Sequence, residues 1–333
     1  AAFCGSCGAP LAPGTVPGSP LSAAVKAADP PPAPPGPAAA VPGPIAGAPA
    51  KRAHLPIGTL IDKKYAVVRV LGEGGMGVVY LARDIHTGLD VVVKAVRSEL
   101  AHRNDVRQRT LAEGRALAQI DHPNVVHLRA VVVDGPNLWL VMQYIDGESL
   151  DKTLAGYIAR GELMPVAEAL GVLRQVAAGV GAAHDEGVIH RDLKPANVLI
   201  RKKDHVAKVT DFGIGKLLTG DTDLTSTGQM VGSPAYMSPE HLRSAKSVDH
   251  RSDVWAMGVI LYELLSGQRP FVSDDAEREM RSHLTAALPS LGRRASRAPA
   301  ALLRLVTAML AKQPQDRPTM AEVVQRLQDV ECA

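Results

Sequence analysis

The first half of the chain alternates between short apolar runs and polar or glycine-containing turns. The runs lie at residues 65–70, 78–82, 90–96 and 138–144, and most contain several β-branched valines. Runs of this length and composition predict β-strands. Residues 110–120 place Ala112, Ala116 and Ile120 at a four-residue spacing, which predicts a helix that ends before Pro123.

The second half carries longer apolar patterns, which predict helices at residues 166–187, 252–267, 302–310 and 320–330. The pattern at 252–267 is mostly apolar, begins at Ser252 and Asp253 and stops at Gly267. A helix that is apolar nearly all round belongs inside a large helical body. Shorter apolar runs at 198–200 and 205–209 predict two more strands.

The N-terminal residues have a different composition. Residues 9–56 are rich in proline, alanine and glycine, and they have little to bury, so we predict a disordered linker. A P-x-x-P docking site is the alternative. Cys4 and Cys7 form a C-x-x-C pair that resembles one knuckle of a zinc ribbon. We interpret residues 1–8 as a partial zinc-ribbon knuckle, which can hold Zn²⁺ only with ligands from an upstream half; a metal-free thiol pair is the alternative.

Charge and cysteine content narrow the function classes. A net charge of +3 over 333 residues gives no support to a nucleic-acid partner held by bulk electrostatics. Three cysteines do not make a disulfide framework. No run approaches the ~20 apolar residues of a membrane span. We therefore expect a cytoplasmic protein with no membrane span in this chain, and any membrane tether would lie outside it.

Residues 71–79 carry the glycine pattern G-x-G-x-x-G-x-V, with Gly72, Gly74 and Gly77 at the glycine positions. Without β-carbons, a backbone can fold tightly over phosphate groups and offer them N–H donors. The flanking runs predict strand, glycine turn and strand, whereas a dinucleotide-binding fold needs a helix after the turn. A plain glycine-rich hairpin is the alternative for this pattern alone.

One charged residue, Lys94, stands inside the apolar strand 90–96. A buried ammonium group needs an anionic partner, because an unpaired buried charge is costly. A strand-end lysine that reaches solvent is the alternative for this strand alone.

Three further strings follow in order. Residues 190–197 are H-R-D-L-K-P-A-N, residues 211–213 are D-F-G, and residues 232–240 are G-S-P-A-Y-M-S-P-E. Together with the glycine pattern and Lys94, they stand in the order of the catalytic motifs of eukaryotic-type (Hanks-type) serine/threonine protein kinases. The chain resembles this family over residues 57–332, and bacterial members of it more than animal ones.

The resemblance implies an α+β fold with two lobes, the protein kinase fold. Residues 57–145 would form a small antiparallel sheet with one helix, and residues 146–332 a larger, mainly helical lobe. It also implies an enzyme of signal transduction, a non-specific serine/threonine protein kinase that transfers the γ-phosphoryl group of ATP to Ser or Thr hydroxyls of protein substrates. The alternative is a pseudokinase, an ATP-binding docking module without catalysis.

Residue roles follow from the same resemblance. Asp192 would orient the attacking hydroxyl and accept its proton, and Lys194 would reach the γ-phosphate. Glu113, on the predicted helix 110–120, would pair with Lys94, and the two would place the α- and β-phosphates. The expected ATP-binding residues are Leu71, Gly72, Glu73, Gly74, Gly75, Met76, Gly77, Val78, Val79, Val92, Lys94, Met142, Ser149 and Leu199.

Asn197 and Asp211 are the expected ligands of Mg²⁺, which Mn²⁺ could replace. Val92 stands where the family usually has alanine. Two extra methyl groups over the adenine ring would raise the KM for ATP modestly.

The resemblance implies a regulatory site as well. Arg191 would bind a phosphate group on the following loop, which offers Thr225 and Thr227 as autophosphorylation sites. Self-association would allow one copy to modify another.

Two structural roles are implied for the helical lobe. Asp253 would cap its helix and also tether the backbone of the 190–197 loop; a cap alone is the alternative. Arg317 would form a buried pair with Glu240, and a surface arginine is the alternative. Ser238 departs from the alanine that the family has before P-E.

Overall fold

The computed structural model divides the chain into two units, Ala1–Arg52 and Ala53–Ala333. It describes residues 54–74, 77–96, 104–135, 137–212, 234–244, 247–291 and 298–331, all within the second unit. The cysteine knuckle, nearly all of the linker, and the loop with Thr225 and Thr227 lie outside the described residues.

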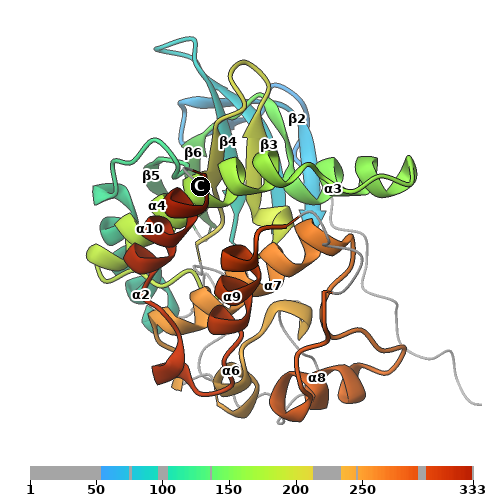
Figure 1. Ribbon diagram of the computed structural model, residues 1–333. Coiled ribbons are helices and arrows are strands. Elements are labelled where there is room, and N and C mark those ends of the chain that lie inside the picture. Colours follow the sequence, from blue (N-terminus) through green and yellow to red (C-terminus); the bar gives the residue numbers. More distant parts are fainter. Residues whose placement is uncertain are drawn as a thin grey trace, which may run out of the picture. The chain divides into compact units, whose positions relative to one another are not determined.

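The first part of the second unit is an antiparallel sheet of six strands in the order β1-β2-β3-β4-β6-β5 (Figure 1). The predicted strands are confirmed, and the sheet comprises β1 Leu60–Ile61, β2 Tyr65–Gly74, β3 Gly77–Asp84, β4 Asp90–Ala95, β5 Leu128–Asp134 and β6 Asn137–Gln143. Because side chains alternate along a strand, Val91 and Val93 of β4 pack in a core on one face of the sheet. Val92 between them packs against the core shared with the helices.

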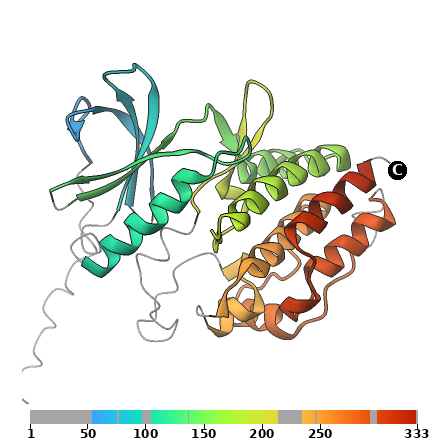
Figure 2. The same cartoon turned by 90° about the vertical axis from the view of Figure 1, so that its left-hand side faces the viewer.

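One helix, α2 (Asn104–Gln119), accompanies this sheet and begins earlier than the pattern of 110–120 predicts. It packs against β5 and crosses below the strands in Figure 2. The helix approaches the sheet closely at Gly114, where a β-carbon would lie 2.5 Å from Cγ2 of Val131. A glycine at this position therefore lets the helix lie directly on the strand.

The sheet part begins before residue 57. The backbone N–H of Leu55 donates to the hydroxyl of Tyr80 at 3.1 Å, and its side chain packs against the core of the sheet. Residues 54–56, which composition assigned to the linker, thus belong with the sheet.

The second part is mainly helical, as predicted (Figures 1 and 2). Its helices are α3 Leu150–Ala159, α4 Val166–Asp185, α6 Pro239–Arg243, α7 His250–Ser266, α8 Ala276–Thr285, α9 Ala300–Met309 and α10 Met320–Glu331. A small sheet, in the order β7-β8-β9, comprises β7 Gly147–Ser149, β8 Val198–Arg201 and β9 Ala207–Val209. The predicted interior position of α7 is confirmed, because it packs against α4 and α9 and nearly all its residues are buried.

Helix α7 starts two residues earlier than predicted. Its N-cap is Asp249, whose side chain accepts a hydrogen bond from the N–H of Arg251 at 2.8 Å. Asp253 lies inside the first turn and is not the cap. Gly267 ends the helix in the left-handed conformation, with φ 74°, as predicted.

Among the described helices, α4 is long and apolar enough to cross a membrane by length and composition alone. Half of its apolar window is buried inside the fold. Leu173, Val176 and Val180 belong to the core, and the helix packs against α10, α7 and β9. Packing in the helical core accounts for its composition.

Candidate active site

The carboxylate of Asp253 holds the backbone of the loop at residues 190–197. It accepts the backbone N–H groups of His190 at 2.8 Å and Arg191 at 2.9 Å, and Nε2 of His184 lies 2.8 Å from it. Burial would raise the pKa of Asp253, but the hydrogen bonds from the His184 ring and from the His190 N–H outweigh burial and lower it. Arg191 adopts a positive φ of 62°, a strained conformation that this tether holds in place.

Asp192 stands at the centre of the loop, with 9% of its surface exposed. The ammonium group of Lys194 donates to Oδ2 of Asp192 at 2.8 Å. The side-chain amide of Asn197 donates to the Asp192 carbonyl at 2.8 Å. Three predicted site residues are thus brought together around one carboxylate.

His190 connects this loop to the D-F-G string. Its Nε2 donates to the Thr210 carbonyl at 3.0 Å, and its ring packs on Phe212 with centroids 4.7 Å apart. Burial lowers the pKa of His190, so the ring is neutral at physiological pH. Because Nε2 carries the proton, Nδ1 is free to accept the N–H of Asp192 at 3.3 Å.

Lys94 pairs with Asp211, and the expected pair with Glu113 is not formed. Nζ of Lys94 lies 2.8 Å from Oδ1 of Asp211, which adopts a positive φ of 60°. The position of α2 on β5 leaves the Glu113 carboxylate without an ion pair to any described residue. Burial raises the pKa of Glu113 to about 7, although the charge of Arg191 opposes that rise.

A cleft of about 490 Å³ opens between the sheet and the helical part beside these residues. Leu71, Val79 and Val92 line it from the sheet, Leu199 from the helical part, and Met142 from β6. The polar end carries Lys94 and Asp211, and the connection Gln143–Ile145 forms one edge with Gly72 and Ser149 nearby. An apolar slot with charged groups at one end suits a flat ring that carries phosphates.

Three of the expected glycine-loop residues do not line this cleft. Val78 is buried in the core on the opposite face of the sheet, because alternate residues of β3 point to opposite faces and Val79 takes the cleft side. Glu73 points away and lies 3.3 Å from the His54 ring. Gly77 has φ 144° and would place a β-carbon 2.1 Å from the Ala95 carbonyl, so it serves the close approach of strands. Gly75 and Met76 lie outside the described residues, and the side of Gly74 is not assigned.

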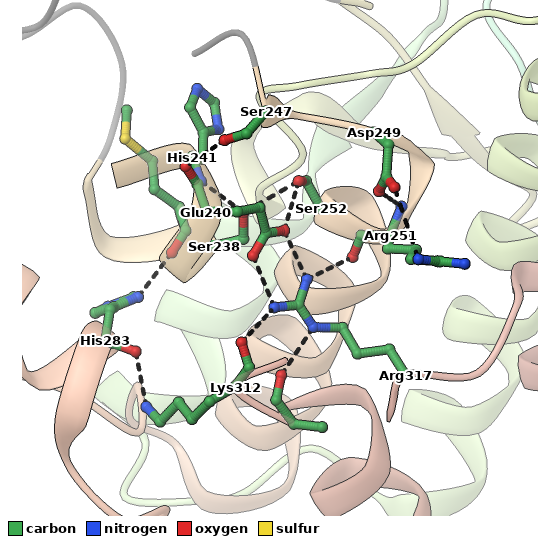
Figure 3. A network of polar contacts seen from close by, with 12 residues as sticks. Ser238, Glu240, His241, Ser247, Asp249, Arg251, Ser252, His283, Lys312 and Arg317 are labelled. Carbon is green, nitrogen blue, oxygen red and sulfur yellow. Dashed lines mark hydrogen bonds and ion pairs between the residues drawn. The ribbon is translucent and has the colours of Figure 1, made fainter. Parts of the chain in front are cut away.

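Beyond the loop that carries Thr225 and Thr227, the chain is held by a buried ion pair, shown in Figure 3. Arg317 donates to both oxygens of Glu240, at 2.7 and 2.8 Å, which confirms the predicted pair. Ser252 donates to the same carboxylate at 2.7 Å. Ser238, in place of alanine, caps α6 by accepting the N–H of His241 and donates to Ser252 at 3.1 Å.

A model of the protein kinase domain matches residues 65–327. The chain belongs to the protein kinase domain family. The kinase resembles bacterial relatives: serine/threonine-protein kinase PrkC of Bacillus subtilis is 36% identical over 80% of this chain and 40% of its own length. Serine/threonine-protein kinase PkaA of Streptomyces coelicolor is 38% identical over 81% of this chain and 50% of its own. This chain thus spans half of these relatives or less.

A solved structure extends the likeness to the fold of the kinase. The crystal structure of the Mycobacterium tuberculosis PknI kinase domain covers 83% of this chain and 99% of its own, with a TM-score of 0.66 and 26% sequence identity. The predicted two-lobed protein kinase fold is therefore confirmed.

The oxygen groups beside the cleft fit a Mg²⁺ ion. The amide nitrogen of Asn197 is committed to Asp192, which leaves its Oδ1 for a ligand, and Asp211 adds a carboxylate. Among the described residues, no cluster of three or more His, Cys, Asp or Glu side chains could hold a metal ion. Mg²⁺ that is bound partly through nucleotide phosphates needs only one or two protein ligands.

Several cleft residues of the kinase were not predicted. Ala196 and Thr210 lie inside or next to the recognised strings, and adjacency could have identified them. Val126 follows the predicted end of α2 and also lines the cleft. Arg69 and Lys152 line its mouth, and no pattern in the sequence marks either residue.

Proposed function

We propose that this chain is a serine/threonine protein kinase, which transfers the γ-phosphoryl group of ATP to Ser or Thr hydroxyls of proteins in signal transduction. One observation carries the proposal. A nearly buried carboxylate, Asp192, holds the ammonium group of Lys194 at 2.8 Å, beside a cleft whose polar end carries Lys94 and Asp211.

Asp192 accepts the proton of the attacking hydroxyl and orients it for attack on phosphorus. Lys194, whose ammonium group donates to Asp192 at 2.8 Å, offsets the charge that develops on the transferred phosphoryl oxygens. Asn197 and Asp211 would hold Mg²⁺, which would neutralise phosphate charge when bound. The bond between the γ-phosphorus and the bridging oxygen breaks, and ADP leaves.

In the nucleotide site, Leu71, Val79 and Val92 cover one face of the adenine ring and Leu199 the other. Met142 closes the back of the slot. The N–H of Gln143 already donates to the His127 carbonyl at 2.9 Å. The ring edge is therefore met by the remaining main-chain groups of residues 143–145, and Ser149 contacts the ribose.

Catalysis requires an exchange of partners at Lys94. A pair between Glu113 and Lys94 would free the Asp211 carboxylate, which would then be available as a metal ligand, and would leave Lys94 positioned for the α- and β-phosphates. A shift of α2 along β5 would bring Glu113 the rest of the way. The half-buried Glu113 side chain, with no ion-pair partner among the described residues, supports this step.

Control of activity is assigned to Thr225 and Thr227, as sites of autophosphorylation between copies, with Arg191 as the receptor of the phosphate group. The supply of ATP favours the cytoplasm as the setting. A Zn²⁺ ion at Cys4 and Cys7 would need two more ligands from outside this chain.

The test uses the whole chain with radiolabelled ATP and Mg²⁺. We expect label to enter protein serine and threonine, and Asp192→Asn to reduce the rate by about 10²–10⁴-fold, the usual contribution of a positioned base. Asp329→Asn on the exposed face of α10 is the matched control and should leave the rate unchanged. Bound ATP without any transfer in the wild-type chain would favour the pseudokinase and contradict the proposal.

A further inference from the structure

A buried histidine of α8 binds the main chain of the segment 234–238, next to the catalytic loop. His283 has 0% of its surface exposed, and its Nδ1 lies 2.8 Å from the carbonyl oxygen of Met237. A carbonyl oxygen only accepts, so Nδ1 carries the proton and donates it. Figure 3 shows the ring beneath the segment that leads into α6.

Met237 belongs to a segment that borders the catalytic loop. Tyr236, Met237 and Ser238 line one small cavity together with Asp192 and Leu193. A polypeptide that presents a hydroxyl group to Asp192 must lie along the surface beside that carboxylate. The segment 234–238 is therefore in position to form part of the wall for such a polypeptide.

His283 is itself held firmly. Its ring packs against Phe271 and Trp255, with centroid distances of 5.0 and 5.9 Å. Nζ of Lys312 donates hydrogen bonds to the backbone carbonyls of His283, at 2.8 Å, and Ser282, at 3.2 Å. The cation of Lys312 also lies 4.3 Å from the centre of the Phe271 ring. Side chain and main chain of His283 are thus fixed independently.

The contacts around Lys312 reach the segment that leads into α6 at a second point, through Arg317. Arg317, which grips Glu240, donates through Nε to the Ala311 carbonyl at 2.9 Å and through Nη2 to the Lys312 carbonyl at 3.4 Å. One route thus passes from Lys312 through His283 to Met237, and the other passes through Arg317 to Glu240. Figure 3 shows His283, Lys312, Arg317 and Glu240 of these routes. The stretch from Met237 to Glu240 is therefore clamped by His283 at one end and Arg317 at the other.

The protonation of His283 suits a fixed donor. Burial lowers its pKa to about 4, with the charges of Lys312 and Arg269 acting in the same direction and the hydrogen bond to Met237 opposing them. The ring is then neutral near pH 7 and has a single N–H, at Nδ1. Its Nε2 has no hydrogen-bond partner among the described residues, so the ring does not relay protons to a neighbour.

We propose that His283 is a positioning residue for the polypeptide substrate. Its Nδ1–H group fixes the Met237 carbonyl, and through it the surface on which residues around the target hydroxyl lie. The nature of the ligand rests on the proposed function, whereas the hold on Met237 does not. Removal of the donor should weaken polypeptide binding and leave nucleotide binding unchanged, because the nucleotide cleft shares no wall with Met237.

The experiment compares His283→Ala, His283→Asn and His283→Gln in the full chain. Asparagine can place an N–H donor near the position of Nδ1, whereas glutamine places it nearer Nε2. Ser282→Ala is the matched control, because within the described part of the chain its hydroxyl bonds only to the Arg278 carbonyl on its own helix. The readouts are kcat, the KM for dephosphorylated casein, the KM for ATP, and amide hydrogen exchange of residues 234–244.

We expect His283→Ala to raise the KM for casein about five- to ten-fold, the loss of one hydrogen bond. The KM for ATP should stay within about two-fold of the wild-type value, since its binding groups are untouched. Exchange of residues 234–244 should accelerate in the alanine and glutamine variants. Asparagine should restore both readouts, and Ser282→Ala should change neither.

Equal rises in both KM values, or asparagine no better than alanine, would overturn the proposal. If His283→Ala does not fold, the asparagine and glutamine variants decide by the same readouts. If the wild-type chain transfers no phosphate, the proposed function fails separately. Amide hydrogen exchange then still tests whether His283 holds residues 234–244. An unchanged exchange rate in His283→Ala would contradict this part of the proposal.

Discussion

Two ion pairs of nearly equal length, Lys94–Asp211 and Arg317–Glu240, differ in their surroundings. Lys94 and Asp211 are 2.8 Å apart, with side chains 12% and 33% exposed. Arg317 and Glu240 are 2.7 Å apart, with side chains 0% and 8% exposed. The second pair has two parallel bonds, a serine hydroxyl and several main-chain carbonyls around it. The first has one bond.

The difference shows that distance alone does not tell a permanent pair from an exchangeable one. Burial would raise the pKa of Glu240, but hydrogen bonds from Arg317 and Ser252 outweigh burial and lower it to about 2. Every charge in that pair is satisfied, so separating its members would strand a buried ion. At Lys94, solvent reaches Asp211, and Glu113 on α2 has no ion-pair partner among the described residues. That pair can change partners at small cost.

The largest effect is expected from breaking the buried pair. Arg317→Ala should lower the free energy of unfolding by about 3–5 kcal/mol, because it leaves the Glu240 carboxylate buried and unpaired. Urea denaturation measures this. Arg281→Ala, which removes an exposed pair with Glu277 on α8, is the control and should change it by less than about 0.5 kcal/mol. Similar losses of unfolding free energy in both variants would contradict the expected difference between a buried and an exposed ion pair.

A smaller effect on the free energy of unfolding, and a gain in stability instead of a loss, is expected from Glu113→Gln. Since the pKa of Glu113 is raised from 4.5 to about 7, the folded state holds its proton after the unfolded state has lost it. Wild-type stability should therefore fall as pH rises from about 4.5 to 7. The glutamine variant avoids that loss and should be more stable at pH 8 by about 1–2 kcal/mol, allowing for partial solvent access.

At pH 4 the carboxyl is protonated in both states, so the two proteins should be equally stable. Urea denaturation at both pH values checks this. A gap of the same size at pH 4 and pH 8 would mean that packing, and not charge, separates them.

The smallest effect on stability is expected at the exchangeable pair. Lys94→Met should change the free energy of unfolding by less than about 1 kcal/mol, because the pair is partly exposed and singly bonded. Phosphoryl transfer should nevertheless fall by at least about 100-fold, since the phosphates lose a positioned cation. Urea denaturation and the radiolabel assay separate the two results. A stability loss as large as that of Arg317→Ala would remove the distinction.

Much of the fold follows from local patterns. The valine-rich runs predicted the strands of the sheet, and the apolar stretch at 252–267 predicted the central helix α7. Val78 was misassigned because consecutive motif residues were all given to the cleft, whereas a strand presents only alternate ones to a face. The start of α7 was misplaced because Ser252, Asp253 and Asp249 are all suitable caps, and only the backbone chooses between them.

The site was less predictable where two partners compete. Glu113 and Asp211 are both suitable for Lys94, and the choice depends on where α2 lies on β5, which no local pattern encodes. His283 was missed for a related reason. Its partner carbonyl is 46 residues away, and a lone histidine in a polar helix gives no sign of that contact. Arg317 was found because a recognised string already contained its partner.

The hydrogen bond between Leu55 and Tyr80 has a practical consequence for recombinant work. A fragment cut at residue 65, where the family match begins, would lose β1. It would also remove the Leu55 N–H that donates to the hydroxyl of Tyr80, a residue of the apolar core. One cut at residue 57 would keep the strand and still strip the Leu55 side chain from the sheet. Expression boundaries for this protein should therefore fall before His54, within the proline-rich stretch.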